Sequence, residues 1–438
     1  MTAMTSTPRP LLNRSLAEFG TTIFAEMSAL AAATGSINLG QGFPDTDGPE
    51  QIREAAVRAL REGRGNQYPP GPGVPELRTA IAAHQLRRYG LTYDPDTEVL
   101  VTAGATEAIA ASLLALLEPG DEVVALEPYY DSYAACIALA GGRRVPVTLR
   151  PHVTEDDEAA AEGGGATTGG ATTGGAITGK SATGRSTTGR SAAFRLDLDE
   201  LRDAVTDRTR LLLINTPHNP TGTVLTRTEL TAIAELAVER DLLVVTDEVY
   251  EHLVYDDAEH VPLATFPGMR ERTVTIGSAG KSFSFTGWKV GWVTAAPELV
   301  TAVRSAKQFL TYVSSGPFQY AVAEALNLPE AYFAAFREDM QAKRDLLSAG
   351  LTEAGFSVFR TAGTYFVTAD IRPLGEHDGF AFCRALPERA GVVAIPNAVF
   401  YDHREAGAPY VRFAFCKRTA VLEEAVARLK ALRARGEA

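Results

Sequence analysis

Short apolar segments that end in a polar residue or a glycine alternate with helical patterns through the middle of the chain. Strands are expected at residues 98–103, 121–126, 211–215, 242–246 and 274–277. Continuous apolar strands separated by helices are typical of a parallel sheet that is covered on both faces. Ligands of such sheets gather at the carboxyl ends of the strands. The residues that follow these strands are therefore the first candidates for a functional site.

The C-terminal third follows another pattern. A long charged amphipathic helix is expected at residues 336–354, strands at 363–370 and 411–415, and a closing helix at 420–435. This order is typical of a smaller α+β domain. An N-terminal helix at residues 16–34 is expected to pack against this small domain, because segments before and after a large domain commonly fold together into one domain.

The length of 438 residues suits two domains. We assign residues 1–50 to an N-terminal arm and part of the small domain, 51–305 to the large domain and 306–438 to the small C-terminal domain. Residues 166–190 repeat a five-residue unit of Gly, Thr, Ser and Ala, which cannot bury enough apolar surface to order itself. We expect residues 151–193 to form a flexible insertion. A docking role for Lys180, Arg185 and Arg190 has no support in the sequence.

Charge and composition exclude several classes of function. The net charge of −12 argues against a general binder of nucleic acid or of anionic membranes. The apolar runs are too short to span a bilayer, and residues 1–14 lack the apolar stretch of a secretory signal. The 3 cysteines are far apart, so neither a disulfide framework nor a metal site is indicated. We expect a cytoplasmic enzyme or binding protein.

Four segments at strand ends carry residues suited to chemistry. Lys281 follows one strand, where a desolvated amine can act as a nucleophile. Asp247 ends another and could orient a cationic nitrogen. Two X-Pro steps after a third strand hold Asn219 in a rigid turn. After a fourth strand, residues 104–107 open a helix whose free N–H groups suit a phosphate. Each of these four signals is weak alone, but their occurrence together at strand ends is rarely produced by chance.

These segments resemble the class I/II aminotransferases, which are fold-type I enzymes that depend on pyridoxal phosphate. Within this class the chain looks most like the kynurenine–glutamine and methionine transaminase group, and like actinobacterial proteins assigned as N-succinyldiaminopimelate aminotransferases. The resemblance runs from about residue 37 to about 418. The motifs that carry it are NLGQGFPD, NQYPPGPGVPELR, NTPHNPTG, TDEVYEHLVYD, SAGKSFSFTGWKVGW and YVRFAFCKR.

The resemblance implies catalytic roles for Lys281, Asp247 and Tyr250. Lys281 would form the imine with the cofactor aldehyde, and Asp247 would pair with the pyridinium nitrogen so that the ring acts as an electron sink. Asn219 and Tyr250 would donate hydrogen bonds to the phenolic oxygen of the ring. Tyr130 would stack on the ring face. The large domain would then be the cofactor-binding domain.

The resemblance also implies a phosphate site and a shared active site. Ser278, Lys289 and the first residues of the helix, Gly104, Ala105 and Thr106, would hold the phosphate. Tyr68 would reach the phosphate of the neighbouring subunit, which implies a homodimer. Lys289 stands where many class I enzymes have arginine, and it still supplies a point charge.

For the substrate, the resemblance implies that Arg412 binds the α-carboxylate, because its planar guanidinium can donate two parallel hydrogen bonds to a carboxylate. Asn219 and the amide of Gly42 would also contact the substrate. Phe24, Tyr129 and Tyr312 match positions that line the side-chain pocket, although each fits ordinary core packing equally well. No second arginine can be assigned to a distal carboxylate. Arg14, Arg64 and Arg372 are the candidates for such a contact. The sequence does not identify the amino donor or the acceptor.

Three other readings compete with an aminotransferase. A carbon–sulfur β-lyase could use the same scaffold, because fold and cofactor do not fix the reaction. A cofactor-binding domain of a transcription regulator would need a helix-turn-helix module, for which the N-terminus leaves no room. A nicotinamide oxidoreductase is disfavoured, because no G-x-G-x-x-G motif opens a strand–helix unit.

Overall fold

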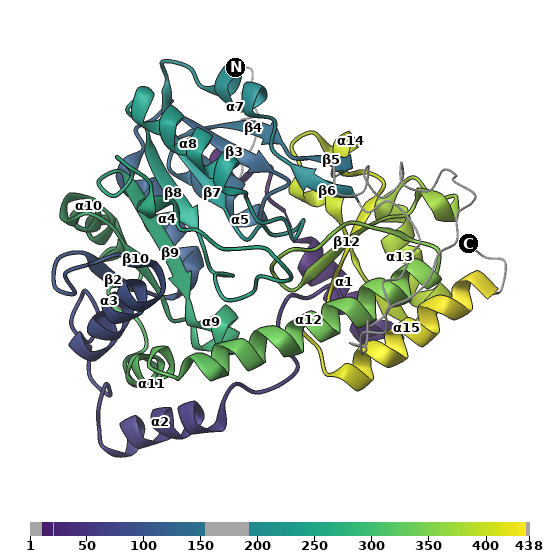
Figure 1. The fold of residues 1–438 in the computed structure, drawn as a ribbon, viewed down its shortest axis with the longest axis horizontal. Coiled ribbons are helices and arrows are strands. Elements are labelled where there is room, and N and C mark those ends of the chain that lie inside the picture. The colour runs from purple at the N-terminus through teal and green to yellow at the C-terminus, as the bar shows by residue number, and fades with distance from the viewer. Residues whose placement is uncertain (1–10, 21, 154–191, 435–438) are drawn as a thin grey trace, which may run out of the picture.

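The computed structural model describes residues 11–20, 22–153 and 192–434 (Figure 1). The repeat at residues 166–190, with its three cationic side chains, lies outside the described residues. Figure 1 shows two groups of elements: a large sheet surrounded by helices, and a smaller sheet beside the long helix α12 (Glu330–Glu353).

A seven-stranded sheet forms the centre of the larger group, in the order β2-β10-β9-β8-β7-β3-β4. Strand β10 runs antiparallel to both of its neighbours, and the other pairs are parallel. The predicted α/β architecture with a mostly parallel sheet is therefore confirmed. The strands are β2 (Val99–Thr102), β3 (Glu122–Glu127), β4 (Arg143–Thr148), β7 (Thr209–Asn215), β8 (Leu243–Asp247), β9 (Thr273–Ser278) and β10 (Gly291–Thr294).

Helices cover both faces of this sheet, as its continuous apolar strands predict. Successive side chains of a strand point to opposite faces: Leu211 and Leu213 belong to one buried cluster, Leu212 and Ile214 to another. The first cluster lies under α4 (Gly104–Leu116), α5 (Asp131–Leu139) and α10 (Pro297–Lys307). The second lies under α7 (Leu198–Ala204) and α8 (Arg227–Glu239).

A third cluster, which includes Val101 and Trp292, packs the β2–β10 edge against more helices. These are α2 (Glu50–Arg61), α3 (Pro75–Tyr89) and α11 (Gly316–Leu326). The short helix α9 (Ala279–Ser282) follows β9 directly, and the 3₁₀ turns η2 (Leu263–Thr265) and η3 (Thr286–Trp288) flank this region. Within the described residues, no helix is both long and apolar enough to cross a membrane.

The smaller group is built on a four-stranded sheet in the order β11-β12-β15-β14. Its strands are β11 (Ser357–Val358), β12 (Phe366–Asp370), β14 (Ile395–Pro396) and β15 (Tyr410–Ala414). Its helical elements are α12, α13 (Gly379–Ala390), α14 (Arg404–Gly407), α15 (Thr419–Ala434), η4 (Arg372–Leu374) and η5 (Asn397–Phe400). In a separate two-stranded sheet, β5 (Arg150–Val153) pairs antiparallel with β6 (Ala192–Arg195).

The N-terminal segment packs against the smaller group. Met27 and Ala31 of α1 (Ile23–Thr34) share a buried cluster with Phe382, and β1 (Ile37–Asn38) pairs in parallel with β13 (Val392–Val393). The helix expected at 16–34 is shorter than predicted, because the Thr22 side chain caps the amide of Ala25. Before it lies only the 3₁₀ turn η1 (Arg14–Leu16). The domain boundaries at residues 50 and 305 stay predictions.

Candidate active site

Lys281 lies on α9, directly after the carboxyl end of β9. Its Nζ donates a hydrogen bond to the hydroxyl of Tyr365 at 3.0 Å, and that hydroxyl donates to the carbonyl of Gly42. Burial lowers the pKa of Lys281 below the usual range of a lysine. The amine is therefore held in place and is easier to deprotonate than a surface lysine, as a nucleophile or a base requires. Tyr365 was not singled out by the sequence.

Asp247 ends β8 and is buried. Its Oδ2 accepts a hydrogen bond from the hydroxyl of Tyr133 on α5 at 2.5 Å. Burial raises the pKa of Asp247, and the hydrogen bond from Tyr133 opposes this rise. The ring of Tyr250, in the same turn, meets the ring of Tyr365 edge-on at 5.2 Å. Asp247, Tyr250 and Lys281 are thus brought together, and Tyr133 is an addition that the sequence did not suggest.

Arg412 on β15 is buried in the site. Its Nη1 donates to Oδ1 of Asn219 at 2.8 Å and its Nη2 to the carbonyl of Gly40 at 3.1 Å, while Nε is buried without a hydrogen-bond partner in the described structure. The rings of Phe366, Phe400 and Phe24 lie 3.9, 4.9 and 5.4 Å from the guanidinium carbon. Burial lowers its pKa to about 10, so it stays cationic at neutral pH. The aromatic rings stabilise the guanidinium cation, which can pair with a carboxylate.

The start of α4 forms a second anion-binding corner. Gly104 has φ +78°, and a Cβ built there would lie 3.3 Å from Nζ of Lys289. Ala103, at the N-cap, offers no side-chain cap, so amides of the first turn are free to face an anion. Gly291 of β10 packs against Gly104, and β10 pairs Gly291 with Ser278. Gly104, Lys289 and Ser278 therefore lie close together, and the phosphate role that the resemblance implies for them stays a prediction.

Two predicted site residues, Tyr68 and Tyr312, lie on the surface of this subunit. Tyr68 and Tyr312 are 81% and 55% exposed, and their rings meet edge-on at 5.5 Å. Phe309, which is 85% exposed, lies near Tyr312 in the chain. Gly42 is held close to Phe366, where a Cβ would come within 2.4 Å of the ring, and its carbonyl is used by Tyr365.

Comparison with known proteins decides which family this site belongs to. The sequence profile of aminotransferase class I and II matches residues 34–162 and 182–429. The chain belongs to the class I and II aminotransferases. It is 52% identical over 425 residues to a probable N-succinyldiaminopimelate aminotransferase of Mycobacterium tuberculosis, covering 95% of this chain and 97% of the relative. It is 36% identical over 431 residues to the methionine aminotransferase of Escherichia coli, covering 97% and 100%.

Solved structures agree with the sequence comparison. The structure of N-succinyldiaminopimelate aminotransferase from Mycobacterium tuberculosis superposes with a TM-score of 0.85 at 52% identity and covers 96% of this chain and 100% of its own. A methionine aminotransferase from Escherichia coli superposes with a TM-score of 0.84 at 35% identity, covering 96% and 100%. The fold-type I architecture predicted from the motifs is confirmed, and the protein is an aminotransferase.

A cavity of about 650 Å³ opens beside the rings of Phe24 and Tyr130 in this aminotransferase. Arg144 and Arg404 line it. Arg144 is held by Glu18 at 3.1 Å and Asp402 at 3.2 Å. Arg404 is exposed and has no ion-pair partner within the described residues. Arg404 is therefore the arginine of this cavity that no carboxylate of the described residues engages.

The three arginines named for inspection do not line this cavity. Arg372 is bound by Asp370, Arg64 pairs with Glu76 at 2.8 Å, and Arg14 lies in η1. Arg144 and Arg404 were missed, because an isolated arginine in a strand or a short surface helix has the sequence signature of any solvated residue.

Proposed function

We propose that this aminotransferase binds pyridoxal phosphate, with Nζ of Lys281 as the covalent attachment point. The observation that carries the proposal is the half-buried Lys281, whose pKa is lowered by desolvation, near the buried acid Asp247. Pyridoxal phosphate supplies an electron sink that stabilises negative charge at the substrate Cα. Borohydride reduction of the loaded enzyme, followed by peptide mass spectrometry, tests the proposal: the cofactor mass should stay on the peptide that contains Lys281.

The residues of the site fit such a group at both of its ends. At one end, the first turn of α4, Lys289 and Ser278 form an anion-binding corner for the phosphate. At the other end, the buried carboxylate of Asp247 would meet a protonated ring nitrogen and hold that proton. The hydrogen bond from the Tyr133 hydroxyl favours the ionised form of this carboxylate and so opposes the effect of burial. Between the ends, Tyr250 and Asn219 would donate to the phenolic oxygen, and Tyr130 would cover the ring face.

We assign the proton transfers to Lys281. Once an incoming amine had displaced it, Nζ of Lys281 would act as the base that takes the proton from the substrate Cα, and its ammonium form would then be the acid that donates a proton later in the same half-reaction. The Tyr365 hydroxyl, 3.0 Å from Nζ, holds the amine in place. A second keto acid reverses the steps, so ping-pong kinetics are expected.

We assign binding of the substrate α-carboxylate to Arg412. Its buried Nε has no partner in the described structure, and a carboxylate would satisfy it. Asn219 holds the guanidinium from the opposite side. The amide of Gly42 is assigned a supporting role, because Tyr365 engages only its carbonyl.

We propose that the enzyme is a homodimer in which Tyr68 and Tyr312 complete the neighbouring site. Both rings are exposed and meet edge-on, and Phe309, three residues before Tyr312, is exposed as well; exposed aromatic residues are typical of an interface. A cytoplasmic location and the absence of membrane and nucleic-acid partners stay predictions.

For the substrate we propose an amino acid with a long side chain, N-succinyldiaminopimelate foremost, because the relatives with the highest identity reported above are named for it. The cavity of about 650 Å³ has room for a long side chain, and Arg404 at its wall would meet a distal carboxylate, while the acidic lining residues Glu18 and Asp402 are already paired with Arg144. Kynurenine, methionine and glutamine are the alternatives. A screen of donors and 2-oxo acids, with both products measured, tests this ranking. A β-lyase would release ammonia and pyruvate without an acceptor, and none of the relatives reported above is named as a lyase.

A further inference from the structure

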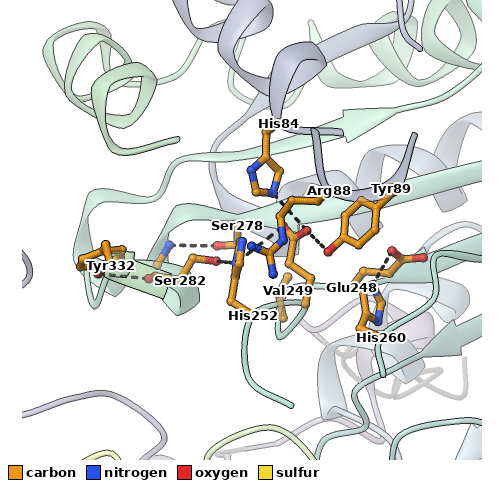
Figure 2. A network of polar contacts seen from close by, with 12 residues as sticks. His84, Arg88, Tyr89, Glu248, Val249, His252, His260, Ser278, Ser282 and Tyr332 are labelled. Atoms are coloured by element: carbon orange, nitrogen blue, oxygen red, sulfur yellow. Dashed lines mark hydrogen bonds and ion pairs between the residues drawn. The ribbon is translucent and has the colours of Figure 1, made fainter. Parts of the chain in front are cut away.

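A buried polar cluster lies behind the turn that carries Asp247 and Tyr250, outside the roles assigned so far. Figure 2 shows that it joins three parts of the chain: helix α3, the turn after β8, and the segment around α9. Its central members are His84 of α3, Glu251 and His252 of the turn, and Ser282 of α9, and all four side chains are buried.

Glu251 anchors the turn to α3. Its Oε2 accepts a hydrogen bond from the Tyr89 hydroxyl at 2.6 Å and lies 3.3 Å from Nε2 of His84 (Figure 2). A carboxylate buried this deeply is retained only where such donors compensate its lost hydration. The turn is therefore fixed to a helix outside the sheet.

His252 joins the same turn to α9. Its Nδ1 lies 2.8 Å from Oγ of Ser282, and its ring stacks on Phe333 of α12 at 4.5 Å with an angle of 19°. The carbonyl of Ser282 accepts from the Tyr332 hydroxyl at 3.4 Å. Burial lowers the pKa of His252 to about 3, so the imidazole is neutral and this contact is a hydrogen bond between uncharged groups.

The position of this hydrogen bond in the chain gives it a consequence for catalysis. Glu251 and His252 directly follow Tyr250, and Ser282 directly follows Lys281. Each peptide unit is planar, with two soft dihedrals per residue. The hydrogen bond between Ser282 and His252 therefore limits how far the backbone at Lys281 can shift relative to the backbone at Tyr250.

The same side chains have the spacing of metal ligands, since one ligand atom each from His84, Glu251 and His252 lie within 4.8 Å of one another. Hydrogen bonding accounts for them better. Tyr89, His84 and Ser282 already engage the candidate ligands, and the Arg88 guanidinium lies 5.4 Å from the ring of Phe333, on which His252 stacks. A second cation would meet electrostatic repulsion there.

We propose that His252 is a positioning residue for the transamination reaction: through Ser282 it sets the position of Lys281 relative to Tyr250, while Glu251 holds the turn against α3. The inference rests on the proposed function of Lys281. It assigns neither His252 nor Ser282 a contact with substrate or cofactor.

The test uses the enzyme loaded with pyridoxal phosphate and two variants, His252→Phe and Ser282→Ala. Phe keeps the ring that stacks on Phe333, and Ala removes only a hydroxyl. Each variant should shift the midpoint of the pH titration of cofactor absorbance by roughly 0.5 unit or more and lower kcat about 5-fold, with KM for the amino donor within about 2-fold of wild type. His252→Asn, whose amide can replace Nδ1, should restore the wild-type midpoint.

A double variant separates positioning from general damage. Because both changes break one hydrogen bond, His252→Phe with Ser282→Ala should be no worse than either alone. The inference is overturned if the losses of kcat in the two single variants multiply in the double variant. It is also overturned if the titration midpoint is unchanged while kcat and Tm both fall. If the wild-type enzyme shows no titrating cofactor band, the proposed function of Lys281 has failed instead.

His260→Phe is the matched control. His260 bonds Glu248 at 3.0 Å and packs edge-on against Tyr89 at 5.7 Å, so it belongs to the same buried region without reaching Ser282. This variant should lower Tm and leave the titration midpoint unchanged. An equal shift in His260→Phe would show that any disturbance of the cluster moves Lys281, and that His252 has no special role.

Discussion

The guanidinium of Arg412 donates a hydrogen bond to the amide oxygen of Asn219 across 2.8 Å. Arg412 lies on β15 of the smaller group, and Asn219 lies in the turn after β7 of the large sheet. One contact therefore ties together the two parts of the molecule between which the substrate is proposed to bind. Because both groups are partly desolvated there, this charged hydrogen bond is stronger than a neutral one in water.

Arg412→Ala is expected to raise KM for the amino donor about 100-fold, because a charged hydrogen bond to the carboxylate is lost in a buried site. Cofactor affinity should change far less. Steady-state kinetics and a cofactor titration check this. Arg404→Ala, at the cavity wall, is the matched control, with little effect on donors that lack a distal charge. A loss of cofactor that exceeds the change in KM would contradict the role assigned to Arg412.

Lys281→Ala is expected to abolish transamination and covalent attachment of the cofactor. The loss should exceed about 100-fold, because both the nucleophile and the general base are removed. Borohydride reduction and mass spectrometry of the intact chain measure attachment directly. Lys289→Ala serves as the comparison, since it should weaken cofactor binding and still allow reduction to fix the cofactor. Attachment that persists in Lys281→Ala would show that another amine is used.

Tyr133→Phe is expected to raise the pKa of Asp247 further, because the hydrogen bond from Tyr133 is the largest of the contributions that lower it. A less ionised Asp247 holds a ring proton less firmly. We expect kcat to fall about 10–100-fold, the size of one hydrogen bond to a charged group. Tyr401→Phe is the matched control: this buried hydroxyl has no hydrogen-bond partner in the described structure. Equal losses in both variants would refute a specific role for Tyr133.

Much of the site could be predicted from sequence because its residues lie at the ends of strands. Lys281, Asp247 and Asn219 follow buried apolar segments, and a parallel sheet brings such ends to one edge. Tyr133 and Tyr365 carry no such signal. Tyr133 lies within a helix whose other buried positions are apolar, so its ring looks like core packing until the crossing of α5 over β8 is known.

The boundaries of elements were less predictable than their existence. The expected helix at residues 336–354 begins at Glu330, because Pro329 precedes it and is tolerated at a helix start. Strand β10 spans four residues and α9 four, which is too short for a periodic pattern. Both are stabilised by tertiary contacts such as the pairing of Gly291 with Ser278, which no local window of sequence contains.

Tyr68→Ala combined with Phe309→Ala is expected to weaken the proposed homodimer. The two side chains are 81% and 85% exposed, so their removal should cost the folded subunit little, while an interface would lose two aromatic contacts. Analytical ultracentrifugation over a dilution series measures the change, and we expect the dimer dissociation constant to rise at least about 100-fold. Leu86→Ala, an exposed apolar residue of α3, is the control. A wild-type chain that sediments as a monomer would overturn the assignment.

Arg404→Ala tests the substrate class. Arg404 lines the cavity of about 650 Å³ and has no ion-pair partner within the described residues. An exposed pair with a carboxylate contributes roughly 0.2–1 kcal/mol, so KM should rise about 2–5-fold for N-succinyldiaminopimelate and stay unchanged for methionine. Added salt should also raise the KM of the wild-type enzyme for N-succinyldiaminopimelate relative to that for methionine, because exposed charges are screened. Arg384→Ala is the control, since Glu26 engages that side chain at 2.7 Å. Equal changes for both donors would place the distal carboxylate elsewhere.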